Sequence, residues 1–580
     1  MNPLARRALL CQSSTFPRQT PNQESRLHAQ GRDRLGIQPR LIRWVLWGLM
    51  SCATATGAFT ADSTSQTTRS TVKVQMRDGI GLATDLYIPS VPGNFPVVLA
   101  RTPYNKSISA SLGTNGAGRG YAVVIQDVRG RFESEGENLP FNLDVTDGFD
   151  TMEWVSRQPW CNGKIGTVGG SAGAITQLQL AIVGHSKLAC QHLVVGAPNL
   201  YQDCLYTGGV FRKSLIEDWL RGSKFSDQAL PRWVEHPLYD DYWRERDISR
   251  NYGSVNCPAV HIGGYWDIFA QGTIDSFLGY QKSGGPAARG SQKLIMGPWT
   301  HGVLQERAGE LTFRNAKRPP GNVHDSWRWF DRWLKGADNG IDRSPPVTYY
   351  VIGDTSDTSA PGNTWRTSET WPPVKATPTA FYLAHDKSLT TTRPSTSASF
   401  HYAFDPANPA PTIGGIQLSI PAGPMDQRKL DSRSDVLVFS TPALDAPLEV
   451  TGQISASLWI SSTAKDTDFF ATLCDVYPDG RAFNLCEGRI RTRFRESFSA
   501  EQFLEQNKVT PIQLDLWATS VIFNKGHRIR VQITSSSAPG FDPNPNTGAP
   551  FRSSTHTAVA TNTIHIGGAT PSRIMLPVAQ

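Results

Sequence analysis

The sequence lacks the patterns that mark metal centres, membrane-spanning helices and nucleic-acid-binding surfaces. Its eight cysteines form no Cys-x-x-Cys motif and no histidine pair stands at metal-ligand spacing, so we expect no metal and no cofactor. The apolar run Trp44–Met50 is too short to span a bilayer, which predicts no stable membrane span. Of the net charge of +7, residues 1–57 carry +6, from eight arginines against two acids, and the remaining chain carries +1. The body therefore gives no electrostatic reason to expect a nucleic-acid partner.

Residues 1–69 are expected to form a leader, a signal-like segment and a linker. Two arginines precede the apolar run Trp44–Met50, and an A-x-A cleavage pattern follows at Ala53 to Ala55. This order predicts export, periplasmic or secreted, although a cytoplasmic location stays open. The stretch before Cys52 also resembles a lipobox, and Ala61–Arg69, rich in Ser and Thr, is expected to be a flexible linker.

Export would permit disulfides, but the spacing of Cys474 and Cys486 argues against one. The two cysteines flank a turn at Pro478-Asp479-Gly480. A two-residue loop would place Cys474 opposite Leu485 and leave Cys486 on the other face, so a bulge would be needed to bring the thiols together. We expect two buried free thiols.

Gly169-Gly170-Ser171-Ala172-Gly173 is the most informative stretch of the chain. It reads G-x-S-x-G, follows the apolar run Ile165–Val168 and precedes a segment of helical composition. A serine at such a strand-turn-helix junction is typical of a nucleophile elbow, in which small neighbours allow a sharp turn that exposes the hydroxyl. In a chain with 51 glycines, an ordinary serine in a glycine-rich turn is the alternative interpretation.

A serine nucleophile needs a histidine base and a carboxylate that orients it. The apolar run Pro258–Ile262 leads through two glycines to Asp267, and the run Leu294–Met296 leads through Gly-Pro to His301. Both follow Ser171 in the order Ser, Asp, His that α/β-hydrolases use. Of the other histidines, His261 lies inside its strand and is expected in the core, and His324 is expected on the surface of a helix.

Several further markers in the same order resemble the cocaine esterase and X-Pro dipeptidyl-peptidase family of α/β-hydrolases from about Thr71 to the C-terminus. They are Arg77-Asp78-Gly79, Leu86-Tyr87-Ile88-Pro89, Arg101-Thr102-Pro103-Tyr104, Gln126-Asp127-Val128-Arg129-Gly130, Gln158-Pro159-Trp160-Cys161-Asn162-Gly163, Gly297-Pro298-Trp299-Thr300-His301 and Trp329-Phe330-Asp331-Arg332-Trp333-Leu334-Lys335-Gly336.

The resemblance implies a role for each candidate. Ser171 would be the nucleophile, Asp267 the orienting acid and His301 the general base. The Tyr104 hydroxyl and the backbone N–H of Ala172 would form the oxyanion hole, each donor contributing about 3–4 kcal/mol. A tyrosine that merely packs at a strand end is the alternative for Tyr104.

The chain departs from the family pattern beside the nucleophile. Many members carry a tyrosine directly after the serine and a glycine three positions after it, where this chain has Ala172 and Ala174. The change would remove an aromatic wall of the acyl pocket. The α-amino-acid ester hydrolases of this family place extra acids just past the triad aspartate, but here Ile268-Phe269-Ala270 follow, which disfavours substrates with a free amine.

The pattern of elements changes near residue 345. At 580 residues the chain is expected to fold into about two to four domains, and its hydrophobic fraction of 39% predicts a globular rather than a disordered chain. Between 70 and 345 apolar strands alternate with helices, which predicts a largely parallel α/β-hydrolase sheet. An aromatic helical insertion at about 203–251, with helices expected at 210–220 and 233–246, would form a cap over the nucleophile. From 346 to 580 short β-rich runs predict an antiparallel β-sandwich, jelly-roll-like by resemblance.

The strands expected in these two parts are named by their apolar runs. In the α/β part they are 97–100, 122–126, 165–168, 193–195, 260–263 and 294–296; in the sandwich they include 348–352, 448–459, 471–477, 512–516 and 528–534.

These observations predict a serine hydrolase that cleaves a carboxylic ester, or an amide, through an acyl-enzyme. One alternative is an X-Pro dipeptidyl-peptidase or acylase acting on amides. Another is an inactive hydrolase scaffold fused to a carbohydrate-binding sandwich. The expected partner is a small-molecule ester or amide, and a homo-oligomer stays open.

Overall fold

The computed structural model describes residues 67–580. The predicted leader, signal-like segment and lipobox lie outside the described residues. Thr67–Arg69, expected at the end of the linker, instead begin strand β1 (Thr67–Gln75), because Thr67 to Arg69 pair with Pro89 to Tyr87 of strand β2 (Gly81–Pro89). None of the helices formed by residues 67–580 is both long and apolar enough to cross a membrane.

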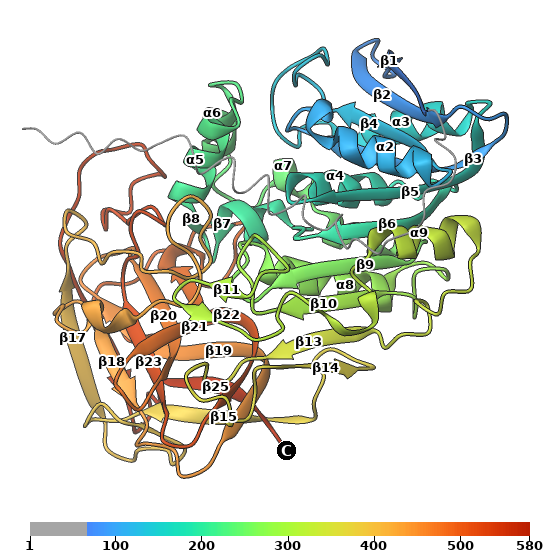
Figure 1. Cartoon of the computed structure of the whole chain (residues 1–580). Helices are drawn as coiled ribbons and strands as arrows, with labels where there is room; N and C mark the ends of the chain where they lie inside the picture. Colours follow the sequence, from blue (N-terminus) through green and yellow to red (C-terminus); the bar gives the residue numbers. More distant parts are fainter. Residues whose placement is uncertain (1–66) are drawn as a thin grey trace, which may run out of the picture. The chain divides into compact units, whose positions relative to one another are not determined.

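A ten-stranded mixed sheet organises the first part of the chain (Figure 1). Its strand order is β1-β2-β4-β3-β5-β6-β9-β10-β13-β14. The seven strands from β4 to β13 in that order run parallel to their neighbours. These strands are β3 (Phe95–Thr102), β4 (Ala122–Asp127), β5 (Cys161–Gly170), β6 (Leu188–Val194), β9 (Ala259–Gly264), β10 (Lys293–Gly297) and β13 (Val347–Val351), with β14 (Thr364–Ser368) at the edge. The first six coincide with the six apolar runs expected in the α/β part, which confirms the predicted α/β fold.

Helices cover both faces of this sheet. On one face α2 (Ala110–Gly118) and α9 (Ser326–Lys335) join the same core cluster as the β4 residues Val123 and Ile125. On the other, α3 (Asp144–Ser156) and α4 (Ala172–Ala181) pack on Val97 and Val124. Helix α8 (Ala270–Ser283) packs beside β9. The continuous apolar strands therefore bury both of their sides.

Strand β13 corrects one expectation. The run 348–352 was expected in the sandwich, but β13 lies parallel to β10, with Leu294 opposite Val347. The apolar run predicts a buried strand without naming its partner, and the pairing joins segments about 50 residues apart. The mixed sheet thus extends past residue 345.

The segment between β6 and β9 is more broken than its aromatic composition suggests. The helix expected over 210–220 begins only at α5 (Lys213–Gly222), since Val210–Phe211 form a strand, β8, paired with β7 (Tyr206–Thr207). The helix expected over 233–246 is divided into α6 (Ala229–Val234) and α7 (Asp241–Arg244). Pro237 lies between them, where its ring disfavours a continuous helix.

The remainder of the described chain is all β. One seven-stranded antiparallel sheet has the order β16-β15-β25-β19-β24-β17, with β22 also paired to β19, and a four-stranded sheet has the order β18-β23-β20-β21. The strands are β15 (Ala376–Leu383), β16 (Leu389–Thr390), β17 (Ala398–Phe404), β18 (Leu437–Ser440), β19 (Leu448–Ser462), β20 (Asp468–Val476), β21 (Ala482–Arg491), β22 (Thr510–Phe523), β23 (Arg528–Thr534), β24 (Ala560–Ile566) and β25 (Arg573–Ala579). Four of the five runs expected in this part fall in β19, β20, β22 and β23.

The β20–β21 hairpin corrects the expected cysteine register. Its loop is longer than two residues, because the Tyr477 N–H bonds to the Arg481 carbonyl, so Cys474 faces Asn484 rather than Leu485. A register shift follows, and Cys486 pairs with Leu473, the neighbour of Cys474. The two thiols therefore point to opposite faces, and both are free and buried, as expected.

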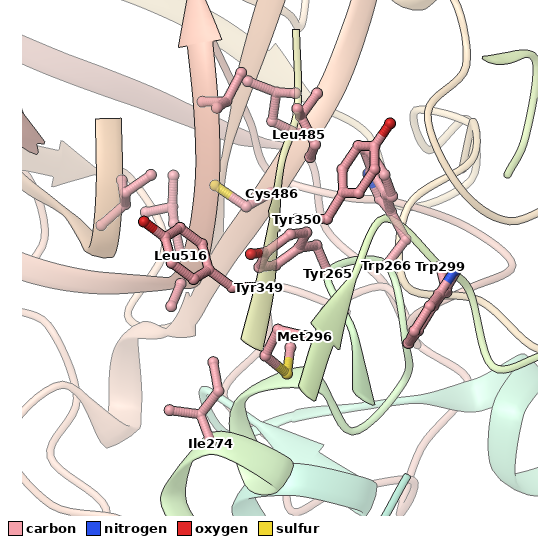
Figure 2. Close-up of a cluster of buried hydrophobic side chains, with 14 of the residues drawn as sticks. Tyr265, Trp266, Ile274, Met296, Trp299, Tyr349, Tyr350, Leu485, Cys486 and Leu516 are labelled. Atoms are coloured by element: carbon pink, nitrogen blue, oxygen red, sulfur yellow. The ribbon is translucent and has the colours of Figure 1, made fainter. Parts of the chain in front are cut away.

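The α/β sheet and the sandwich share one hydrophobic core (Figure 2). Tyr349 of β13 and Met296 of β10 belong to the same buried cluster as Leu516 of β22 and Leu485 of β21. Both parts contribute apolar side chains to this junction. Strands β21 and β22 of the sandwich are therefore held against the α/β sheet, which carries the candidate site.

Candidate active site

Ser171 lies at the sharp turn between β5 and α4. Its φ of 57° and ψ of −123° are strained for a residue other than glycine, as in a nucleophile elbow. The Ser171 N–H donates to the Val194 carbonyl of β6 at 2.9 Å, which fixes the turn. A Cβ on Gly169 would approach the Gly173 carbonyl oxygen to 2.9 Å, so this position requires glycine. At Gly173 a Cβ would meet nothing closer than 3.6 Å, so the second glycine of the motif is sterically less demanding.

The structure brings Asp267 and His301 to Ser171. They follow the neighbouring parallel strands β9 and β10, whose carboxyl ends lie at the same edge of the sheet as that of β5. The His301 Nε2 lies 2.8 Å from the Ser171 Oγ, and the His301 Nδ1 lies 2.5 Å from the Asp267 Oδ2. Three side chains separated by 34 to 130 residues thus form one hydrogen-bonded chain.

Burial and a second hydrogen bond hold Asp267 in place. Its side chain is fully buried, and its Oδ1 accepts the Phe269 N–H at 2.7 Å. The ring of Phe269 meets His301 edge-on, with centroids 5.7 Å apart. The imidazole is therefore bound by a carboxylate on one nitrogen and confined by an aromatic ring beside it.

Tyr104 lies on the loop after β3, and its hydroxyl accepts a hydrogen bond from the Trp219 Nε1 at 3.0 Å. Burial raises the pKa of Tyr104, while hydrogen bonds with Trp219 and Ser171 lower it in part. The phenol therefore keeps its proton near neutral pH. Since Trp219 occupies a lone pair of the oxygen, the O–H itself is available as a donor.

Ala172 is the first residue of α4, and its backbone N–H belongs to the first turn, where no intrahelical acceptor exists. The partial positive charge of a helix N-terminus favours an anion at this point. The structure thus places both predicted oxyanion residues, Tyr104 and Ala172, beside the Ser171 hydroxyl.

A pocket opens beside Ser171, and its lining is apolar apart from that hydroxyl, the Cys204 thiol and the Trp219 indole. Its walls come from five separate segments. They are Phe141, Ala172, Ile175, Cys204, Leu215, Ile216, Trp219, Ile268, Phe269 and Leu418. Burial raises the pKa of the Cys204 thiol to about 12, which keeps it neutral. Among residues 67–580, no carboxylate or ammonium group lines this pocket.

Most of the residues that line the pocket were not among the site residues predicted from the sequence. Ala172 is small, as noted from the sequence, yet aromatic walls come from Phe141, Trp219 and Phe269 instead. Phe141 and Trp219 stack with an interplanar angle of 5°. Leu418 comes from the loop between β17 and β18 and has no sequence signal, since the loop carries no periodicity.

Arg212 joins three of the segments that build the pocket. It is 1% exposed, and its guanidinium donates to the carbonyls of Asp203, Ile268 and Ile416 at 2.7–3.1 Å. Burial lowers the pKa of Arg212 to about 10, so it remains charged near neutral pH. Ile268 is itself a wall residue, Asp203 directly precedes the wall residue Cys204, and Ile416 lies two residues before Leu418. Arg212 therefore joins the segment between β6 and β9, the loop after β9 and the loop between β17 and β18.

The other histidines singled out from the sequence lie away from Ser171. His261 is buried inside β9 and contacts the Ser276 Oγ at 2.9 Å; burial lowers its pKa to about 3. His324 precedes α9 and is half-buried rather than on a helix surface. Among residues 67–580 no group of three or more His, Cys, Asp or Glu side chains could hold a metal ion.

Comparisons with known proteins agree with this geometry. Residues 78–227 and 217–303 match the X-Pro dipeptidyl-peptidase (S15 family) model, and residues 339–575 match the X-Pro dipeptidyl-peptidase C-terminal non-catalytic domain. Cocaine esterase of Rhodococcus sp. (strain MB1 Bresler) is 33% identical over 88% of this chain and 98% of its own length. A putative serine esterase of Mycobacterium bovis is 27% identical over 81% of this chain and 90% of its own.

Solved structures give the same result. An α-amino acid ester hydrolase superposes with a TM-score of 0.74 at 25% identity, and an aminopeptidase from a marine sediment archaeon (Thaumarchaeota) with 0.75 at 26%; each match covers 91% of this chain and 99% of the other. The chain therefore belongs to the cocaine esterase and X-Pro dipeptidyl-peptidase family, and it is a serine hydrolase that acts on esters or amides.

Proposed function

We propose that the protein hydrolyses carboxylic esters through an acyl-enzyme on Ser171. The observation that carries the proposal is the hydrogen-bonded chain from Asp267 through His301 to the Ser171 Oγ. As the Oγ attacks the ester carbonyl carbon, the His301 Nε2 takes its proton and then delivers it to the leaving alkoxide. A water molecule activated by the same nitrogen attacks the acyl-enzyme and releases the acid. Asp267 holds the Nδ1–H and stabilises the imidazolium.

The Tyr104 hydroxyl and the Ala172 N–H would stabilise the oxyanion of each tetrahedral intermediate. Two features support this role: Trp219 orients the Tyr104 oxygen, and Ala172 begins α4. Deleting one such donor costs about 100- to 1,000-fold in kcat. Tyr104→Phe is therefore expected to leave a weakened enzyme, whereas Ser171→Ala should leave none of the triad chemistry.

The pocket supports an apolar acyl group as the recognised part of the substrate. Its walls offer hydrophobic and aromatic surface, and the described part of the chain places no carboxylate there that could pair with a substrate ammonium. A cationic α-amino group would lose its hydration there without compensation. For this reason substrates with a free α-amino group are disfavoured for this chain, although its structural neighbours include an archaeal aminopeptidase and an α-amino acid ester hydrolase. Amide cleavage by an acylase or an X-Pro dipeptidyl-peptidase remains the second candidate, supported by the S15 family match.

The decisive experiment is labelling with a fluorophosphonate probe and peptide mapping, with Ser171→Ala as the matched control. It is combined with turnover of p-nitrophenyl esters and the corresponding p-nitroanilides of acetate to octanoate. Labelling at Ser171, with faster turnover of the esters, is expected. Labelling with faster turnover of anilides would favour the amidase alternative. Labelling at another residue, or full activity in Ser171→Ala, would refute the triad assignment.

We also propose that the chain is exported after cleavage near Ala55. This rests on the sequence of residues 40–55 alone, which lie outside the described residues. N-terminal sequencing of protein from the extracellular and periplasmic fractions tests it. A start at residue 56 is expected, and an intact N-terminus in the cytoplasm would refute it.

A further inference from the structure

We propose that Arg131 is a positioning residue that fixes Tyr104 from two sides, through its backbone and through its hydroxyl. The inference rests on the proposed function, in which Tyr104 donates to the oxyanion. Arg131 follows β4 in the turn after Gly130 and is 5% exposed. It does not touch the substrate pocket, so its effect must pass through other residues.

The first contact is to the loop that carries Tyr104. The Arg131 Nε donates to the Pro103 carbonyl at 2.9 Å, directly before Tyr104. On the other side of Tyr104, the Lys106 N–H donates to the Asp127 Oδ1 at 2.7 Å. Asn105 between them has a φ of 81°, so the loop does not follow a relaxed backbone path. The short strand-end loop is thus held by residues of the β4 turn on both sides of Tyr104.

The second contact is to the end of the cap helix α5. Helix α5 closes with bonds from the Phe225 N–H to the Leu220 carbonyl and from the Lys224 N–H to the Arg221 carbonyl. This is the pattern of a Schellman turn, here with Lys224 at a φ of 57° in the position that glycine usually occupies.

The turn presents two carbonyls to the Arg131 guanidinium. The Arg131 Nη1 donates to the Lys224 carbonyl at 2.9 Å, and the Nη2 donates to the Ser223 carbonyl. A cation here also complements the negative end of the α5 dipole. Trp219, whose indole holds the Tyr104 hydroxyl, lies on the last turn of α5. One guanidinium therefore binds both the Tyr104 loop and the helix that orients the Tyr104 side chain.

The acceptors of Arg131 indicate a geometric role rather than an ion pair. They are three backbone carbonyls and the Asn138 side-chain oxygen at 3.0 Å. None of the ion pairs formed by residues 67–580 includes Arg131, and the guanidinium carbon lies over the Phe225 ring, 4.3 Å from its centroid. Burying a cation without a partner carboxylate is costly, so the site depends on all of these hydrogen bonds. Lysine has the charge but not the planar fork that spans both segments.

The test is a double-mutant cycle between Arg131→Met and Tyr104→Phe, measured as kcat and KM on one p-nitrophenyl ester. If Arg131 acts through Tyr104, Arg131→Met should lower kcat about 10-fold when Tyr104 is present. The loss is smaller than for removal of the hydroxyl, because a misplaced Tyr104 hydroxyl still stabilises the oxyanion in part. In the Tyr104→Phe background the same change should cost less than about twofold, since the group it positions is absent. Any change of KM should be the same in both backgrounds, because Trp219, which lines the pocket and lies on the helix that Arg131 binds, is present in both.

Arg246→Met is the matched control. Arg246 lies in the same insertion and donates to the Tyr242 carbonyl within it and to the Asn142 carbonyl and Asn142 Oδ1 outside it. Its guanidinium stacks on Tyr242 at 3.9 Å, and its hydrogen bonds do not reach the Tyr104 loop. It should lower thermal stability without a loss of kcat that depends on Tyr104. Arg131→Lys, which keeps the charge, should fold and lose part of kcat with the same dependence on Tyr104.

Equal losses of kcat from the Arg131 variants in both backgrounds would overturn the proposal and leave the oxyanion role of Tyr104 intact. Wild-type activity in Tyr104→Phe would instead refute that role, and this inference with it.

Discussion

Truncation of Leu418 tests whether a residue of the sandwich part sets the acyl specificity of the α/β part. Leu418 lines the pocket beside Ser171 and is itself half-buried. Leu418→Ala removes three carbon atoms from the wall. At about 0.8 kcal/mol per buried CH₂ group, three fully buried carbon atoms correspond to a transfer free energy of about 2.4 kcal/mol. Because Leu418 is only half-buried, we expect its truncation to change the binding free energy of the acyl chain by about 1–2 kcal/mol. The change enlarges the pocket, so longer acyl chains should gain relative to short ones.

The assay is kcat/KM for p-nitrophenyl acetate, butyrate, hexanoate and octanoate, with wild type and variant compared side by side. The ratio of octanoate to acetate should rise about 5- to 30-fold, the range that 1–2 kcal/mol corresponds to. Leu444→Ala is the matched control, because Leu444 is a half-buried leucine that packs on the core of the same sandwich and does not line the pocket. A ratio that changes less than twofold in Leu418→Ala, with the thermal midpoint unchanged, would show that this pocket does not bind the acyl chain.

Three further predictions concern the triad, the pocket scaffold and pH. Asp267→Asn should keep the fold and lower kcat about 10⁴-fold, because the amide no longer fixes the His301 tautomer, whereas an effect below tenfold in steady-state turnover would contradict the orienting role. Arg212→Met should lower stability by about 3 kcal/mol or more in urea unfolding, since it leaves three buried carbonyls without their donor, and an unchanged midpoint would show that these carbonyls find other partners. Although burial lowers the pKa of His527, its hydrogen bonds with Asp475 and Asp354 raise it above its usual value. The stability advantage of wild type over His527→Gln should therefore be fully present below about pH 6.5 and decline as the pH rises through the folded-state pKa, and an advantage that grows above pH 7 would contradict this sign.

The parallel strands and the three triad candidates could be predicted because each depends on local sequence. An apolar run that ends in glycine predicts a buried strand, and a polar residue just past it is placed at the sheet edge whatever the loop lengths are. For this reason Ser171, Asp267 and His301 could be named without knowing how the chain between Ser171 and His301 folds.

Most of the features that the sequence did not predict depend on partners far away in the chain, although one depends on a local residue. The run that became β13 was correct as a strand but was assigned to the wrong sheet, since periodicity does not name the neighbour. The break in the predicted helix 233–246 was signalled by Pro237, but the composition of the segment was helical. Leu418 and Arg131 carry no local signal at all: one is a leucine in an irregular loop, and the other is one of 57 basic residues. Their roles appear only when the cap, the sheet and the sandwich are packed together.

The site is built from loops, and this explains why buried arginines are important to it. Loops that meet away from a regular ladder leave carbonyl oxygens that need donors, and burial excludes water as the donor. Arg131 and Arg212 each donate to three such carbonyls, which come from two separate segments for Arg131 and from three for Arg212. Only arginine offers five donors in a rigid fork and stays charged when buried, so one side chain can join segments that do not otherwise pair. Two wall residues belong to that framework, because the Trp219 indole donates to the Tyr104 hydroxyl and Ala172 carries the second proposed oxyanion donor. The aliphatic side chains of Leu215 and Leu418 cannot form hydrogen bonds, so substitutions there should change the acyl preference while the framework that holds Tyr104 and Ser171 persists. Acyl specificity therefore depends on the aliphatic part of the wall, and catalytic geometry on the residues that form hydrogen bonds.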